Sequence, residues 1–195
     1  MSVGIKIVEN PKQPMSMHPQ KFAMWLFILT VVMIFASLTS AYIVKRGDGN
    51  WRVFDLPQMF YVTSGIILLS SASLHYAVTG AKKDLLKRVK TGIFLTLILG
   101  IAFLIGQFYS WKELISNNVY FTGGNPAESF IYVLTGVHWV HLVSGLIFGL
   151  IVTVNTFRFK VHSKSMAQLE MFATYWHFLG ALWIYLFVFL MSNHQ

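Results

Sequence analysis

The feature that most constrains this chain is a series of long stretches that contain no Asp, Glu, Lys or Arg. Charged residues bound each stretch, and even the shortest has the roughly 20 residues that a helix needs to cross the hydrocarbon of a bilayer. The pattern therefore predicts an all-α integral membrane protein with five transmembrane helices. Their expected spans are residues 22–44, 56–80, 91–112, 129–157 and 171–192.

The composition supports the same class of protein. Of the 195 residues, 55% are hydrophobic and 11% are charged, whereas soluble domains carry roughly 25% charged residues. The chain has no cysteine, which excludes disulfides, iron–sulfur clusters and thiolate metal sites. The formal charge of +8 is typical of basic loops that meet anionic lipid headgroups, so we expect no nucleic-acid partner.

The distribution of basic residues predicts the orientation. Eleven of the 15 Lys and Arg residues belong to the N-terminal tail and to the second and fourth connections. Cytoplasmic segments carry such an excess, so the N-terminus is expected in the cytoplasm and the C-terminus outside. The chain then divides into a cytoplasmic tail, residues 1–21, and a five-helix transmembrane domain, residues 22–195.

The predicted spans hold few polar groups that could carry chemistry. Pumps and transporters use charged residues within the membrane, and their absence from the span interiors disfavours transport by this chain alone. His138 and His141 lie three residues apart, on one helix face with Cβ atoms about 5–6 Å apart. One helix face cannot supply both axial ligands of a haem, and no carboxylate or thiol is near enough in the sequence to complete a metal site. We therefore expect both to be neutral and hydrogen-bonded to neighbouring helices.

A second pair of histidines leaves two alternatives open. His75 and His177 lie at similar depths on different predicted helices, near their cytoplasmic ends. They are either haem ligands of a small b-type cytochrome or interfacial groups that contact lipid headgroups or a partner.

Other polar residues have expected structural or surface roles. We expect hydrogen bonds within the helix bundle from Gln107, Ser70 and Ser71. Contacts with lipid or with a partner on the cytoplasmic side are expected from His75, Arg158, Glu170, His177, Lys82, Lys83 and Arg88. For the basic members of this set, the alternative is that they only fix the topology.

Several stretches together resemble subunit III of haem–copper cytochrome c and quinol oxidases. "LTGVHWVHLVSGLIF" carries the family's TG-x-H-x-x-H-x-x-x-G pattern, and "LEMFATYWHFLG" carries its E-x6-H spacing within "YWHF", here Glu170 and His177. Weaker matches are "MWLFILTVVMIFASLTSAYIVKR", "FYVTSGIILLSSASLHYA" and "GQFYSWKEL". The resemblance extends from about residue 20 to the end and corresponds to the five-helix form of the family.

The resemblance implies a non-catalytic subunit with no haem or copper of its own. Haem and copper are expected in partner subunits of an oxidase that reduces O2 to water and pumps protons. The implied partners are the catalytic subunit I, subunit II and phospholipids, with membership of a larger respiratory assembly left open. The implied location is the bacterial inner membrane. An accessory chain of a quinol oxidase or nitric oxide reductase is the alternative within the same family.

The chain departs from the family pattern at three positions. The family usually has carboxylates where this sequence has Val31, Ser110 and Gly180. Roles that depend on those carboxylates, such as a group facing a lipid cleft, are therefore in doubt. A packing role does not need them, because burying a carboxylate in the membrane is costly.

Overall fold

A computed structural model describes residues 19–49, 51, 56–122, 124–157 and 167–193. They form five α-helices: α1 (Pro19–Gly47), α2 (Met59–Lys82), α3 (Leu86–Ser116), α4 (Pro126–Phe157) and α5 (Ala167–Asn193). All five are long and apolar enough to cross a membrane, which confirms the all-α prediction of five spanning helices. Arg158 and almost all of the predicted tail lie outside the described residues.

Four of the five helices are longer than the charge-free stretches suggested, and α2 is about as long as its stretch. α3 begins at Leu86 and ends at Ser116, so its 31 residues extend about 46 Å, well beyond a hydrocarbon thickness of roughly 30 Å. Lys and Arg do not end a helix, because their long side chains can carry the charge to the interface while the backbone stays helical. The predicted boundaries therefore do not coincide with the helix ends.

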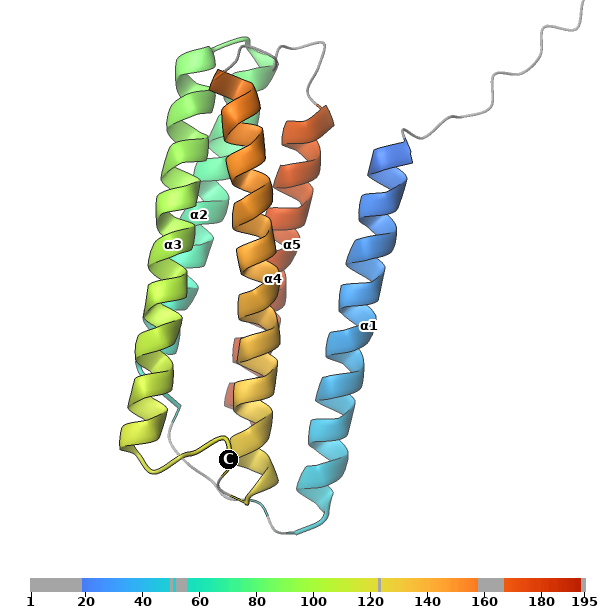
Figure 1. The fold of residues 1–195 in the computed structure, drawn as a ribbon, viewed down its shortest axis with the longest axis vertical. Helices are drawn as coiled ribbons and strands as arrows, with labels where there is room; N and C mark the ends of the chain where they lie inside the picture. Colours follow the sequence, from blue (N-terminus) through green and yellow to red (C-terminus); the bar gives the residue numbers. More distant parts are fainter. Residues whose placement is uncertain (1–18, 50, 52–55, 123, 158–166, 194–195) are drawn as a thin grey trace, which may run out of the picture.

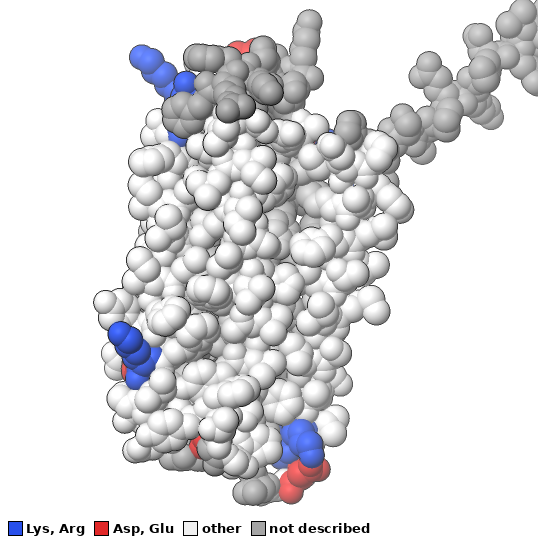
Figure 2. All heavy atoms as spheres, in the orientation of Figure 1, with Lys and Arg blue, Asp and Glu red and all other residues white. Residues whose placement is uncertain are grey.

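The bundle consists of four closely packed helices with α1 at one side (Figure 1). α2 and α3 form the most extensive helix pair, α4 packs on α3 and α5, and α5 packs on α2. Within the described residues, α1 contacts α4 and α5 but neither α2 nor α3. The face in Figure 2 has a wide uncharged belt, with Lys and Arg side chains placed toward the ends of the bundle.

Small residues allow the helices to approach closely, as is common in membranes. A Cβ atom at Gly92 of α3 would lie 2.7 Å from the Cβ of Ala77 and 2.9 Å from the carbonyl oxygen of Ser73 on α2. A Cβ atom at Gly100 would lie 2.7 Å from the Trp176 ring of α5. These glycines therefore fix the α2–α3 separation and admit the Trp176 ring beside α3.

Hydrogen bonds join the helices inside the same region. The Trp176 Nε1–H donates to Ser70 Oγ at 2.9 Å, and the Trp183 Nε1–H donates to Ser64 Oγ at 3.0 Å. The Ser73 hydroxyl donates to the carbonyl oxygen of Gly92 at 2.9 Å. Because lipid tails cannot satisfy these groups, the bonds orient α5 and α3 on α2.

The turn after α2 places basic residues at one end of the bundle, called here the upper end because it is uppermost in Figure 1. The Leu85 N–H donates to the carbonyl oxygen of Gly80 at 3.0 Å, and Asp84 has φ 53°. This tight reversal brings Lys82 and Lys83 beside the first turn of α3.

We predict that Gly92→Ala destabilises the protein by about 1–3 kcal/mol, because the added methyl would meet backbone atoms that cannot move aside easily. The matched control is Gly65→Ala on α2, where a Cβ atom has nothing within 4 Å. That change should be neutral or should stabilise by up to about 1 kcal/mol through helix propensity. Unfolding of the detergent-solubilised chain measures both variants. Equal stability of the two would contradict the close α2–α3 contact.

Candidate functional site

His138 lies at the centre of the bundle, enclosed by aromatic rings. The side chain is 0% exposed, and its ring centroid lies 5.3 Å from that of Trp183 and 6.0 Å from that of Phe103. Neither ring nitrogen has a hydrogen-bond partner among the described residues. The structure thus differs from the expected bond to a neighbouring helix and gives this residue an aromatic contact surface instead.

His141 faces α1 and bonds within its own helix. Its Nδ1 lies 2.7 Å from the carbonyl oxygen of Val137, and its ring centroid is 5.9 Å from that of Phe35. The Tyr175 hydroxyl donates to the backbone oxygen of His141 at 3.3 Å. Because one nitrogen of His141 is engaged by the helix backbone and His138 is enclosed by rings, the pair does not converge on a shared ligand position.

The other predicted hydrogen-bonding residues have different environments. Ser70 is buried and accepts the bond from Trp176. Ser71 lies against α5, where its Oγ would be 3.2 Å from a Cβ atom at Gly180. Gln107 is 1% exposed, and neither its amide nitrogen nor its amide oxygen has a partner in the described part of the chain.

A polar concavity at the upper end gathers four of the predicted surface residues. This cleft, called here the upper cleft, has a volume of about 370 Å³ and lies between α2 and α5. Its polar and charged lining comes from His75, Lys82, Glu170, Thr174 and His177. Two imidazoles and an ammonium group therefore face one cleft with a single carboxylate.

An ion pair ties α1 to this cleft. Lys21 Nζ lies 2.7 Å from Glu170 Oε2, and the two side chains are 37% and 41% exposed. Such exposed pairs contribute roughly 0–1 kcal/mol, so the bridge adds little stability. It does neutralise the carboxylate of Glu170, which leaves Lys82 and the histidines to determine the charge of the cleft.

Two of the other predicted basic residues, Lys83 and Arg88, do not line the cleft. Lys83 is exposed in the turn after α2, and the Arg88 guanidinium lies 5.6 Å from the centre of the Tyr76 ring. Arg158, the other predicted contact, is outside the described residues. No group of three or more His, Asp or Glu residues that could hold a metal occurs in the described ranges.

Sequence reasoning missed several contacts. Lys21 was treated as the last residue of the cytoplasmic tail, and the Trp176 and Trp183 indoles were not recognised as hydrogen-bond donors. Glu128 was treated as a boundary charge, yet it lies in the first turn of α4 and is 1% exposed. A carboxylate in the first helical turn interacts favourably with the helix dipole, and this was the available signal.

The three positions where the family usually has carboxylates are all interior. Val31 is 1% exposed, Ser110 is 0% exposed, and Gly180 is buried against α2. The Ser110 hydroxyl donates to the carbonyl oxygen of Gly106 at 3.1 Å, so its hydrogen bond is made within α3. Neutral residues at these positions avoid the cost of burying charge.

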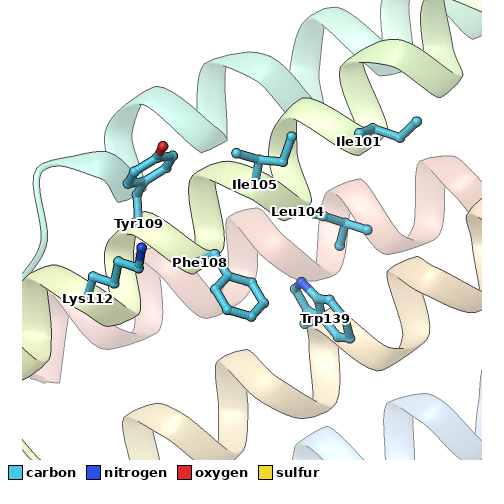
Figure 3. Close-up of a pocket in the computed structure, with 7 residues that line it drawn as sticks. All are labelled: Ile101, Leu104, Ile105, Phe108, Tyr109, Lys112 and Trp139. Atoms are coloured by element: carbon cyan, nitrogen blue, oxygen red, sulfur yellow. The ribbon is translucent and has the colours of Figure 1, made fainter.

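A second concavity on the bundle is apolar and faces the lipid side of α3 and α4 (Figure 3). It has a volume of about 410 Å³, and Leu104, Phe108 and Trp139 contribute to its walls, with Lys112 at one end. Most of this lining is hydrocarbon or aromatic ring, as expected of a surface that contacts lipid tails. It offers no cluster of groups that could carry a reaction.

Comparison with known proteins extends over most of the chain. The family described as "Cytochrome c oxidase subunit III" matches residues 50–193. The chain is 28% identical to "Cytochrome bo(3) ubiquinol oxidase subunit 3" of Buchnera aphidicola subsp. Schizaphis graminum, over 88% of this chain and 93% of the relative. It is also 28% identical to "Cytochrome c oxidase subunit 3" of a Bacillus species, over 84% of this chain and 80% of the relative.

A further relative is "Cytochrome c oxidase subunit 3" of Corynebacterium diphtheriae, 26% identical over 83% of this chain and 82% of the relative. The family match covers well over half of the residues, and it includes α2 to α5 with the His138/His141 pair and the Glu170/His177 spacing. The chain therefore belongs to the cytochrome c oxidase subunit III family, whose members are subunits of haem–copper terminal oxidases.

Proposed function

We propose that this chain is a supporting subunit that packs on the catalytic subunit I of a haem–copper oxidase, beside subunit II, and binds phospholipid. The oxidase reduces O2 to water with proton pumping, and the haem and copper belong to the partner subunits. The observation that carries this proposal is that the buried polar groups make contacts between helices. Ser64, Ser70 and Ser73 bond to neighbouring helices, and His138 contacts aromatic rings.

The position of the charged residues supports the same role. The ionisable side chains other than the histidines and tyrosines lie at the helix ends, in the turns or in the undescribed segments. A subunit whose interior is devoted to helix contacts suits a scaffold better than a reaction centre. His75 and His177, the pair considered as haem ligands, lie at the rim of the bundle in the upper cleft.

The upper cleft is the proposed site for an anionic phospholipid headgroup. Lys82, His75 and His177 face it, while the carboxylate of Glu170 is paired with Lys21. A phosphate placed there would meet one ammonium group and up to two imidazole N–H donors. Lys83, Arg88 and Arg158 would add attraction over a longer range, since basic residues near the membrane surface each contribute about 1 kcal/mol toward anionic lipid.

The proposed setting is the inner membrane of a bacterium, with the upper end in the cytoplasm. Basic residues are concentrated in the tail and in the connections at that end, as cytoplasmic segments usually are. The relatives named above come from bacteria, and they include both a ubiquinol oxidase and cytochrome c oxidases. The quinol oxidase setting is thus a second candidate that a specific relative favours.

We predict that the tagged chain, purified in mild detergent, brings down a catalytic subunit with the absorbance of a haem protein. The chain separated from that complex should show no Soret band. Mass spectrometry of the co-purifying chains distinguishes a cytochrome c oxidase from a quinol oxidase or nitric oxide reductase. A Soret band that stays with the isolated chain and disappears in His75→Ala or His177→Ala would instead identify a b-type cytochrome.

We also predict that Lys82→Ala weakens binding of phosphatidylglycerol to the delipidated chain about fivefold, which corresponds to the loss of roughly 1 kcal/mol. The charge-matched control is Lys112→Ala, because Lys112 is exposed at the opposite end and lies over the Tyr109 ring at 5.6 Å. The control should bind like the unmodified chain. Equal losses in the two variants would show that binding follows net charge rather than the upper cleft.

A further inference from the structure

Five buried polar atoms without partners belong to three residues of α3 and α4, two helices that pack against each other. They are Nε2 and Oε1 of Gln107, both ring nitrogens of His138 and Nε1 of Trp139. None has a hydrogen-bond donor or acceptor within reach in the part of the chain that the structure describes. Gln107 is 1% exposed and His138 is 0% exposed. Such a concentration is unusual, because about nine in ten buried polar groups in proteins have a partner.

The contacts between α3 and α4 place Gln107 within about one helical turn of the level of His138. The Phe103 ring lies 6.0 Å from the His138 ring, and Trp111 Nε1 donates to Thr135 Oγ1 at 3.1 Å. Gln107 follows Phe103 by four residues and precedes Trp111 by four, so it lies on the same face of α3, one helical turn from each. It therefore lies between the level of His138 and that of Thr135.

Trp139 is held at this level by two further contacts. Its ring centroid lies 6.2 Å from that of Trp111 and 6.4 Å from that of Phe108, the residue after Gln107. Figure 3 shows the indole nitrogen on the edge of the Trp139 ring nearest to α3. The donor of Trp139 thus points toward the helix that carries Gln107.

The protein alone cannot satisfy this cluster. A direct bond between Gln107 and His138 would use one atom of each and leave the other amide atom and the other ring nitrogen unpaired. A side chain of a partner subunit cannot reach two residues that are already 0–1% exposed in the isolated chain. Leaving such groups dry in a membrane is costly, because lipid offers no substitute hydrogen bonds.

The chemistry of the cluster defines the species that completes it. The amide offers donors and an acceptor, a neutral imidazole offers one of each, and an indole only donates. A ligand must therefore both donate and accept, and it must be small and uncharged at this depth. Water fits these requirements, and buried waters typically bond to about three polar groups that would otherwise be unsatisfied.

We propose that the α3–α4 interface holds ordered water bound between Gln107 and His138, with the Trp139 indole as a further donor. This water links α3 to α4 at the level of the T-G-x-H-x-x-H pattern. It also helps to set the tautomer of His138, since a ring nitrogen that carries the proton donates to the water and a ring nitrogen without it accepts from the water. The inference concerns the interior of this subunit and does not depend on the proposed lipid cleft or on the identity of the partner subunits.

The direct test is a high-resolution cryo-EM map of the assembled oxidase that contains the unmodified chain. We expect at least one density peak within about 2.6–3.2 Å of both the Gln107 amide and a His138 ring nitrogen. A map that resolves ordered water elsewhere in the bundle but shows no peak here would overturn the proposal.

The sign of a stability change gives an independent test. In Gln107→Met, a bound water loses its amide partners and His138 is left poorly paired. The melting temperature of the full chain in nanodiscs should therefore fall by about 2–4 °C, the shift expected from losing one buried hydrogen-bonded group in a chain of this size. If the site is dry, the same change removes two unpaired polar atoms, and the melting temperature should rise.

Ile105→Met is the matched control, since Ile105 lies on the same helix and is 53% exposed. It introduces the same side chain toward lipid and should leave the melting temperature unchanged within about 1 °C, as for surface substitutions in general. A rise in Gln107→Met relative to this control would contradict the water site.

Discussion

Hydrocarbon offers no hydrogen bonds, and this constraint governs every polar side chain within the five helices. The chain meets it in two ways. Hydroxyl groups bond to a carbonyl of their own helix, as Thr96 does with Gly92 at 2.8 Å, or to a neighbouring helix, as Ser73 does. The indoles of Trp176 and Trp183 have hydroxyl partners, in the Trp176–Ser70 and Trp183–Ser64 pairs. Because each bond of the second kind joins a particular pair of helices, the hydrogen bonds of these polar groups also determine how the helices are arranged.

The two tryptophans make α5 the element on which the packing of the other helices depends. Trp176 and Trp183 are both 0% exposed and seven residues apart, so they lie on one face of α5, about two turns apart. Trp176 fits against Gly100 of α3, while the Trp183 ring contacts Phe103 of α3 at 5.0 Å and His138 of α4 at 5.3 Å. A large ring needs a small neighbour in close packing, which explains why Gly100 faces the Trp176 ring. The His138 imidazole thus belongs to the aromatic core rather than to a ligand set.

Much of this fold could be predicted from the sequence because charge placement directly reflects the membrane boundary. The five spans followed from the charge-free stretches, and the end-region location of His75 and His177 followed from their depth in those stretches. Helix ends could not be predicted in the same way, since Lys and Arg continue a helix beyond the hydrocarbon. The Lys21–Glu170 pair, between residues 149 apart, depends on where α1 docks, and the sequence has no pattern that specifies it. The sequence also predicted hydrogen bonds for Gln107 and His138. It could not predict that the described residues would offer these two side chains no partner.

The proposed supporting role does not require carboxylates at the three neutral positions. A Cβ atom at Gly180 would already lie 3.2 Å from Ser71 Oγ. Because a carboxylate side chain is larger still, the Ser71 side chain limits which residues fit at position 180. At Val31, an ionised group would face the protein interior from a helix whose contacts, within the described part of the chain, are with α4 and α5 alone. α1 has few contacts to offset the desolvation of a buried charge, which amounts to several kcal/mol. The neutral residues Val31, Ser110 and Gly180 therefore avoid the desolvation cost of a buried charge in the weakly packed α1 and at the tight α2–α5 contact. The hydrogen bonds that hold the bundle stay intact.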